Sequence, residues 1–128
     1  MDILDGMRVA VTGGRDYDDA ETIERVFDAL PSTVTIINGG CRGADFLCMI
    51  EAKKRGMDIE IFRADWERYG KSAGPIRNSA MVDTADMLIA FEGGKGTANC
   101  IRAAKAKGIP VIRVTKGGID GLLSSGEE

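Results

Sequence analysis

Apolar runs alternate with amphipathic stretches along most of the chain, and this alternation is the strongest constraint on its fold. Short apolar runs such as residues 34–38 have the length of buried strands. Between them, apolar residues recur at helical spacing, as in residues 18–30. Strands that alternate with helices form a parallel sheet covered on both faces. Because crossovers are right-handed, the sequence predicts a three-layer, Rossmann-like open α/β fold with strand order 3-2-1-4-5.

The predicted elements follow from these two periodicities. Strands are expected at residues 7–12, 34–38, 58–62, 86–91 and 110–114. Helices are expected at residues 18–30, 43–55, 76–84 and 97–107, with Gly56 and Gly108 ending two of them. Residues 64–75 are predicted to form a polar loop, and residues 116–128 a flexible tail with one short helical turn at 121–123. The chain of 128 residues fits one domain, 1–128, with its core at 7–115.

Composition excludes several classes of function. The chain has no histidine, so His-dependent nucleophilic relays and His-based zinc sites are excluded. Three cysteines without CxxC spacing predict free thiols in a reducing compartment. A net charge of −3 and 5% aromatic residues argue against a nucleic-acid partner. We therefore expect no metal and no cofactor.

The N-terminal sequence and the hydropathy point to the cytoplasm. No apolar run approaches the roughly 20 residues that a membrane-spanning helix needs. The first residues, MDILDG, are acidic and unlike a secretion signal. The sequence predicts a cytoplasmic protein without a membrane partner.

Glycine-rich segments follow three of the predicted strands. The carboxyl ends of parallel strands share one edge, so these segments are expected to converge beside strand one, at the topological switch point. Glycine lets backbone N–H groups approach a ligand, and the helix starts add partial positive charge. None of the segments matches GxxxxGK[ST] or GxGxxG, which argues against Walker ATPases and standard NAD sites. The predicted contacts with an anionic ligand are Gly13, Gly14, Arg15, Gly39, Gly40, Arg42, Gly43, Gly93, Gly94, Lys95, Gly96 and Thr97.

Four motifs occur in order along the chain: GGRDY (13–17), GGCRGAD (39–45), GPIRNSAM (74–81) and GGKGTA (93–98). With them, the chain from about residue 7 to residue 115 resembles the SLOG superfamily, and within it the small YspA/YpsA-related proteins. The superfamily includes the LOG cytokinin-activating phosphoribohydrolases, once called lysine decarboxylases, and the DNA-processing protein DprA. The resemblance implies a nucleotide or nucleotide-derived ligand. Because LOG proteins form dimers, it also implies a homodimer or higher homo-oligomer.

The LOG motif PGGxGTxxE is only partly retained. Its glycines and threonine match this chain, but its proline position holds Glu92 and its glutamate position holds Cys100. Arg77 matches the arginine that LOG enzymes carry on the preceding helix. A carboxylate beside the sugar stabilises the charge of glycosidic cleavage, whereas a buried cysteine acts mainly as a small apolar residue. The resemblance therefore implies a retained phosphate cradle without the catalytic carboxylate.

Arg77, Glu92 and Asp45 are the candidate catalytic residues, and each has a simpler interpretation. Asp45 either complements a helix dipole or binds a ribose hydroxyl. Glu92 is either an exposed loop acid or a ligand contact, and Asp16 either forms a turn or contacts the ligand. Arg77 is either a surface residue or a phosphate contact, and the neighbouring Asn78 bonds either the backbone or the ligand.

Trp66 and Tyr69 lie in the predicted loop after strand three. They either stack on a base or close over the site as a lid, or they cover the sheet edge or a dimer surface.

Three functions remain in order of preference. The first is a nucleotide-binding module that acts as a sensor or sequestering protein. The second is a phosphoribohydrolase or related N-glycosidase, and the third is a DprA-like binder of single-stranded DNA, which requires a basic track with stacking aromatics.

Overall fold

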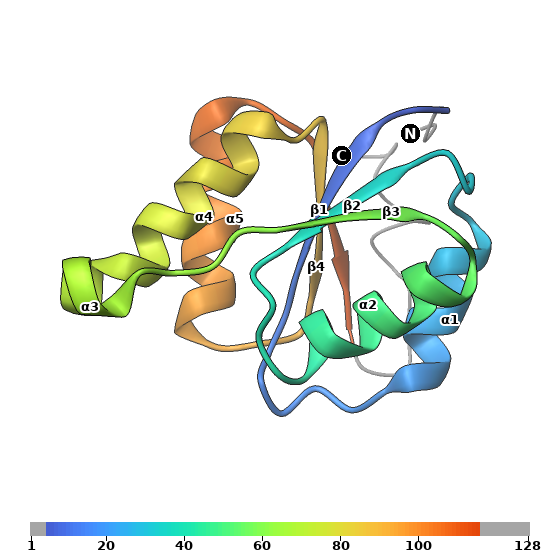
Figure 1. The fold of residues 1–128 in the computed structure, drawn as a ribbon, viewed down its shortest axis with the longest axis horizontal. Coiled ribbons are helices and arrows are strands. Elements are labelled where there is room, and N and C mark those ends of the chain that lie inside the picture. Colours follow the sequence, from blue (N-terminus) through green and yellow to red (C-terminus); the bar gives the residue numbers. More distant parts are fainter. Residues whose placement is uncertain (1–4, 116–128) are drawn as a thin grey trace.

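A parallel sheet with the strand order β3-β2-β1-β4-β5 forms the centre of the structure (Figure 1). The computed structural model describes residues 5–115, so the tail predicted at 116–128 and its helical turn lie outside the described residues. The predicted α/β class and strand order are confirmed. The strands are β1 (Arg8–Thr12), β2 (Thr35–Asn38), β3 (Asp58–Ile61), β4 (Met87–Phe91) and β5 (Val111–Val114).

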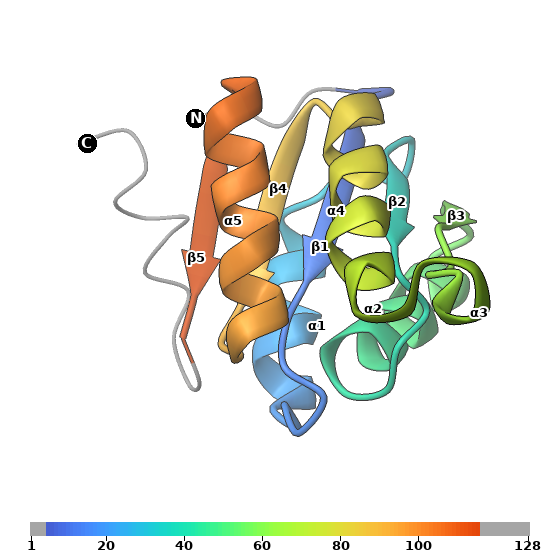
Figure 2. The same cartoon turned by 90° about the vertical axis from the view of Figure 1, so that its left-hand side faces the viewer.

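Helices cover both faces of this sheet. Helices α1 (Ala20–Asp28) and α2 (Ala44–Lys54) lie on one face, and α4 (Ala73–Thr84) and α5 (Lys95–Lys107) lie on the other (Figures 1 and 2). Successive residues of a strand point to opposite faces, so neighbouring β1 residues belong to different apolar clusters. Val9 and Val11 pack with the α1 and α2 side, whereas Ala10 packs with the α4 and α5 side.

Local capping explains where several helices begin and end. The Asp19 side chain accepts a hydrogen bond from the Thr22 N–H at 3.1 Å and so caps α1. Gly108 has a φ of 86°, and its N–H bonds the Ala104 carbonyl at 3.0 Å, which ends α5 as predicted.

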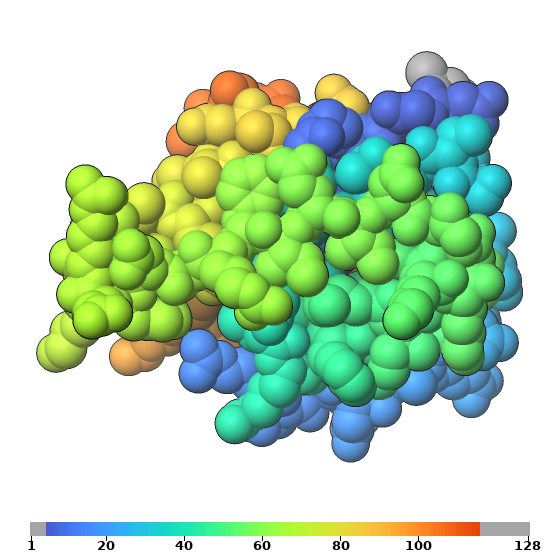
Figure 3. Space-filling model, in the orientation of Figure 1, coloured from blue at the N-terminus to red at the C-terminus, as the bar shows by residue number. Residues whose placement is uncertain are grey.

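The prediction of a continuous loop at residues 64–75 is wrong. The structure has a short helix α3 (Trp66–Tyr69), a 3-10 turn η1 (Gly70–Ser72) and an earlier start of α4. The Asp65 side chain accepts from the Arg68 N–H at 3.1 Å and caps α3. Pro75 lies in the first turn of α4, where a helix does not need the missing N–H. Helix α3 consequently projects from the N-terminal end of α4 (Figures 1 and 3).

None of the helices within residues 5–115 has the length and apolar character required to cross a bilayer.

Ile89 provides a test of the central packing. It is fully buried on β4 and pairs with Val11 on one side and Ile112 on the other. Ile89→Ala should lower the free energy of unfolding by about 2–5 kcal/mol, because the lost apolar contacts leave a cavity. Urea unfolding measures this loss. The control Ile76→Ala, at a side chain that is 44% exposed, should cost less than about 1 kcal/mol, and equal losses would contradict the packing described.

Candidate functional site

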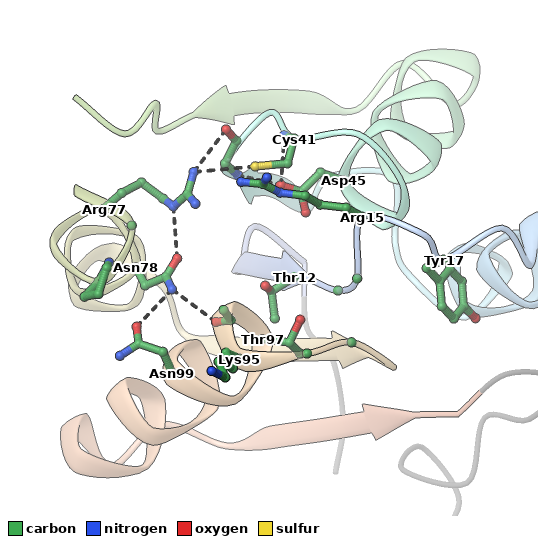
Figure 4. A pocket seen from close by; sticks show the side chains of 18 of the residues that line it. Thr12, Arg15, Tyr17, Cys41, Asp45, Arg77, Asn78, Lys95, Thr97 and Asn99 are labelled. Atoms are coloured by element: carbon green, nitrogen blue, oxygen red, sulfur yellow. Dashed lines mark hydrogen bonds between the residues drawn. The ribbon is translucent and has the colours of Figure 1, made fainter. Parts of the chain in front are cut away.

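The carboxyl ends of β1, β2 and β4 open into a cleft of about 830 Å³ (Figure 4). Its walls are the β1–α1, β2–α2 and β4–α5 loops and the first turns of α4 and α5. Strands β1 and β4 are neighbours in the sheet, and the chain reverses its direction of travel across the sheet between them. The cleft therefore occupies the topological switch point, where open α/β sheets bind ligands.

Backbone contacts join the three loops. The Gly14 N–H donates to the Glu92 carbonyl at 3.0 Å, and the Gly14 carbonyl accepts from the Ala44 N–H at 3.1 Å. A Cβ at Gly93 would lie 2.6 Å from the Gly14 nitrogen and would also collide with the Thr97 hydroxyl. Glycine at position 93 is thus required for the close approach of two loops.

Arg77 and Asn78 connect the wall formed by α4 to both neighbouring walls. Arg77 Nε donates to Asn78 Oδ1 at 2.9 Å, and its Nη1 donates to the carbonyls of Gly39 at 3.2 Å and Phe62 at 3.4 Å. The buried Asn78 amide donates from Nδ2 to the Gly96 carbonyl at 3.3 Å. The guanidinium is therefore held in one place by hydrogen bonds within the protein, several of which are drawn as dashed lines in Figure 4.

Asp45 is a buried acid in this cleft, with only 6% of its surface exposed. Its Oδ2 accepts from the backbone N–H groups of Gly39 and Cys41, both at 3.2 Å. Burial raises the pKa of Asp45 to about 6, although these hydrogen bonds and the nearby Arg77 charge partly oppose the rise. The carboxyl is therefore mostly ionised at neutral pH and is sensitive to acid near pH 6.

The N-terminus of α5 contributes backbone donors and positive charge. Ala98 is the first residue of this turn whose N–H bonds back, to the Gly94 carbonyl at 3.0 Å, so the preceding amides have no partner within the helix. Lys95 at the helix start and Arg102 two turns later line the same cleft. The cationic lining residues are Arg15, Arg77, Lys95 and Arg102, and the acidic ones are Asp16, Asp45 and Glu92.

Most residues predicted from sequence meet in this cleft. The predicted residues in its lining are Gly13, Gly14, Arg15, Asp16, Gly39, Asp45, Trp66, Arg77, Asn78, Glu92, Gly93, Gly94, Lys95, Gly96 and Thr97. Four other predicted residues, Gly40, Arg42, Gly43 and Tyr69, lie outside the lining.

These four residues have other surroundings. The exposed Arg42 side chain faces Asp16 at 3.8 Å, and Gly43, at a φ of 78°, packs against the carbonyls of the β1–α1 loop. Tyr69 lines a separate cavity of about 140 Å³ beside Phe62 and Ile76. Gly40 faces the end of β3.

The sequence interpretation missed several lining residues. Asn99 and Arg102 follow Lys95 by four and seven positions, so the helical period places all three on one face of α5. Once Lys95 was assigned to the site, this spacing would have predicted the other two. The missed lining residues are Thr12, Tyr17, Cys41, Gly74, Pro75, Met81, Asn99 and Arg102.

Cys100 is fully buried and lies outside the cleft lining. It packs with Ala10, Leu88 and Met81 in the core beneath α4 and α5. Burial raises the pKa of its thiol to about 11, so the side chain is neutral at physiological pH. This position therefore supplies an apolar core residue and no charge.

No group of three or more acidic or cysteine side chains within residues 5–115 is arranged to hold a metal ion. The chain's three cysteines, Cys41, Cys48 and Cys100, are free thiols.

The geometry defines a Rossmann-like domain with a cleft, lined by glycines and charged side chains, at the carboxyl edge of its sheet. Residues 7–69 match the family described as YspA, cpYpsA-related SLOG. The Gene 61 protein of Mycobacterium phage D29 is 41% identical over 120 residues, which cover 82% of this chain and 94% of that protein. The chain belongs to the YspA/cpYpsA-related SLOG family.

Two solved structures share the fold. DprA from Streptococcus pneumoniae superimposes with a TM-score of 0.76 and 20% identity over 93% of this chain. The chain spans only 54% of that DprA chain. The X-ray structure of TM1055 gives a TM-score of 0.65 and 20% identity, over 83% of this chain and 72% of that one. At this identity, both similarities concern the fold alone.

The buried Asp45 predicts a specific dependence of stability on pH. Its pKa rises from 3.8 in the unfolded chain to about 6, so the folded state binds more protons between these values. Protonation of Asp45 contributes fully to the free energy of unfolding below about pH 4. As the pH rises through about 6, this contribution is lost, and the free energy of unfolding falls by on the order of 3 kcal/mol. Asp45→Asn should therefore gain stability relative to wild type between pH 4 and pH 7. Urea unfolding across this range measures the difference, and a difference that does not change with pH would disprove the assignment.

Proposed function

We propose that the protein binds a nucleotide or nucleotide-derived phosphate ligand in the cleft, as a sensor or sequestering module. The observation that carries this proposal is the convergence of the α5 N-terminus and the fixed Arg77 guanidinium on one cleft. Family membership and the shared fold support a nucleotide-related role.

The first turn of α5 suits a phosphate group. Its free N–H groups and the helix dipole favour an anion, and Lys95 adds a full positive charge. Gly94 lines the cleft and has no heavy atom within 4 Å of its Cβ position, so a ligand oxygen can approach the backbone there. Thr97, buried in the same turn, offers a hydroxyl.

Arg77 suits a second contact with the same anion. Its Nε and Nη1 are held by protein acceptors, whereas Nη2 makes no hydrogen bond to any residue that the structure describes. A guanidinium fixed in this way binds phosphate oxygens with little loss of side-chain freedom.

Trp66 suits the base. Its side chain is 51% exposed, and it lines the cleft from α3, next to Gly74 at the start of α4. An exposed indole at a cleft rim offers a face on which a base can stack.

A phosphoribohydrolase is the second candidate, and the pKa of Asp45 favours it. A carboxyl with a pKa of about 6 is suited to general acid–base chemistry near neutral pH. The neutral, buried Cys100 argues against the LOG mechanism, because it occupies the position of the LOG glutamate. Binding without hydrolysis therefore remains our proposal. The third candidate, DprA-like binding of DNA, requires a basic track. The cleft does not provide one, because acidic residues lie among its cationic ones.

Gly94→Val tests the phosphate cradle. The added side chain meets no protein atom near its Cβ but fills the cleft side of the loop, so it should weaken binding at least tenfold. Calorimetric titration with nucleoside monophosphates and ADP-ribose measures the affinity, and circular dichroism checks folding. Ala106→Val adds similar volume to the exposed far end of α5 and should leave affinity unchanged. A folded Gly94→Val protein with undiminished affinity would remove the cradle from the proposal.

Product analysis separates binding from hydrolysis. Purified protein incubated with nucleoside monophosphates should release no free base, because the LOG glutamate position is a neutral thiol. Liquid chromatography detects the base. Release that disappears in Arg77→Ala and in either Glu92→Gln or Asp45→Asn would instead establish the phosphoribohydrolase.

A further inference from the structure

We propose that the cleft selects ribonucleotides over deoxyribonucleotides, and that Asp45 makes this selection by accepting hydrogen bonds from the ribose hydroxyls. This inference rests on the proposed function and adds the class of nucleotide. It concerns a binding residue and requires no chemical step.

The surroundings of Asp45 fix the direction of its carboxylate. An acid at the second position of a helix is ordinarily exposed, but this side chain is 94% buried under the β2–α2 loop. Two backbone N–H groups, from Gly39 and Cys41, hold Oδ2. The Asn38 amide also bonds the Asp45 carbonyl, at 3.3 Å. The carboxylate is therefore a rigid part of the cleft wall.

The second oxygen of the same carboxylate is available to a ligand. Oδ1 accepts no hydrogen bond from any residue between 5 and 115. Among the described side chains, only Tyr17 Oη is a fully buried polar atom that lacks a hydrogen-bond partner. Asp45 Oδ1 has no partner either, so it is not fully buried. Asp45 lines the cleft, and we take Oδ1 as the oxygen that a ligand in the cleft reaches. An ionised carboxylate can only accept hydrogen bonds, so the complementary ligand group is a donor.

The neighbouring charges indicate which donor. No cation in the described part of the chain lies within 4.0 Å of Asp45, because Arg77 directs its Nη1 to the Gly39 carbonyl instead. The cleft thus presents an unpaired acceptor beside an anchored cation. A ligand that carries an anion next to neutral hydroxyl donors matches both groups, and a sugar phosphate has this chemistry.

The position of Asp45 favours the sugar over the base. A chain of hydrogen bonds runs from Asp45 through Gly39, Arg77 and Asn78 to Gly96 in the first turn of α5. Figure 4 shows Asp45 and Arg77 on one side of the cleft and Lys95 and Thr97 on the other. In a nucleotide whose 5′-phosphate binds at α5, the ribose is the next group along the molecule. The base then lies at the rim of the cleft, beside the exposed Trp66.

The test compares each nucleotide with its own 2′-deoxy form. The four ribonucleoside 5′-monophosphates and their 2′-deoxy counterparts are titrated against the full chain by calorimetry. We expect the ribonucleotide to bind about tenfold or more tightly, as for a hydrogen bond to a charged group. Asp45→Asn should reduce the ratio of the two affinities to below about threefold. Asp83→Asn, an exposed acid on α4 that pairs with Lys107, should leave the ratio unchanged.

Each possible result of this test bears either on the inference about Asp45 or on the proposed function. Equal affinities for the two forms in wild type, or an unchanged ratio in a folded Asp45→Asn, would overturn the inference while leaving the proposed function intact. Loss of guanine nucleotides alone in the variant would show that the carboxylate reads the base, which also overturns it. Binding of none of the eight compounds would also overturn the inference, and the proposed function would be contradicted only if ADP-ribose failed to bind as well. If Asp45→Asn does not fold, Asp45→Ala and the wild-type ratio provide the same decision.

Discussion

The hydrogen bond between Arg77 Nε and Asn78 Oδ1 determines the shape of the cleft, because each partner also binds a different wall. Arg77 reaches the carbonyls at the ends of β2 and β3, and the Asn78 amide reaches the first turn of α5. A buried amide with several partners is costly to disrupt, since each lost hydrogen bond leaves a polar group without water. Two adjacent side chains on α4 thus hold three separately encoded segments at a fixed spacing.

The spacing of apolar residues predicted the layers and the strand order, because it shows which face of each helix or strand is buried. The same logic failed at residues 64–75, where helix α3 has no buried residue and so no apolar pattern to detect. Its signal is only the capping side chain of Asp65. At the site, the glycine loops identified the converging segments, but for Asp45 the sequence left two interpretations open, a first-turn acid and a contact to a ribose hydroxyl. Its burial results from the fold of the β2–α2 loop over it, which no local pattern encodes.

The cleft combines features that reduce stability with features that suit a ligand. Ionised Asp45 is unfavourable where it lies, because burial opposes its charge. Polar groups whose charge costs stability are typical of binding sites, where activity and stability conflict. By contrast, the position that carries a glutamate in LOG enzymes is here an apolar core residue, Cys100, which adds to packing. The polar groups of this cleft therefore fit the binding function that we propose, and a carboxylate at the LOG position is missing.

The backbone contacts of Gly14 have a consequence for binding kinetics. One residue, Gly14, links the β1–α1 loop to the β4–α5 loop through its N–H and to α2 through its carbonyl. Loops joined in this way lose little conformational entropy when a ligand arrives, because their freedom was lost on folding. For the ligand that we propose, association would then require no slow closure of these loops, and its rate would be set by diffusion and by attraction of the phosphate to the cations at Arg77 and Lys95. Affinity differences between ligands should accordingly reside in how long each remains bound.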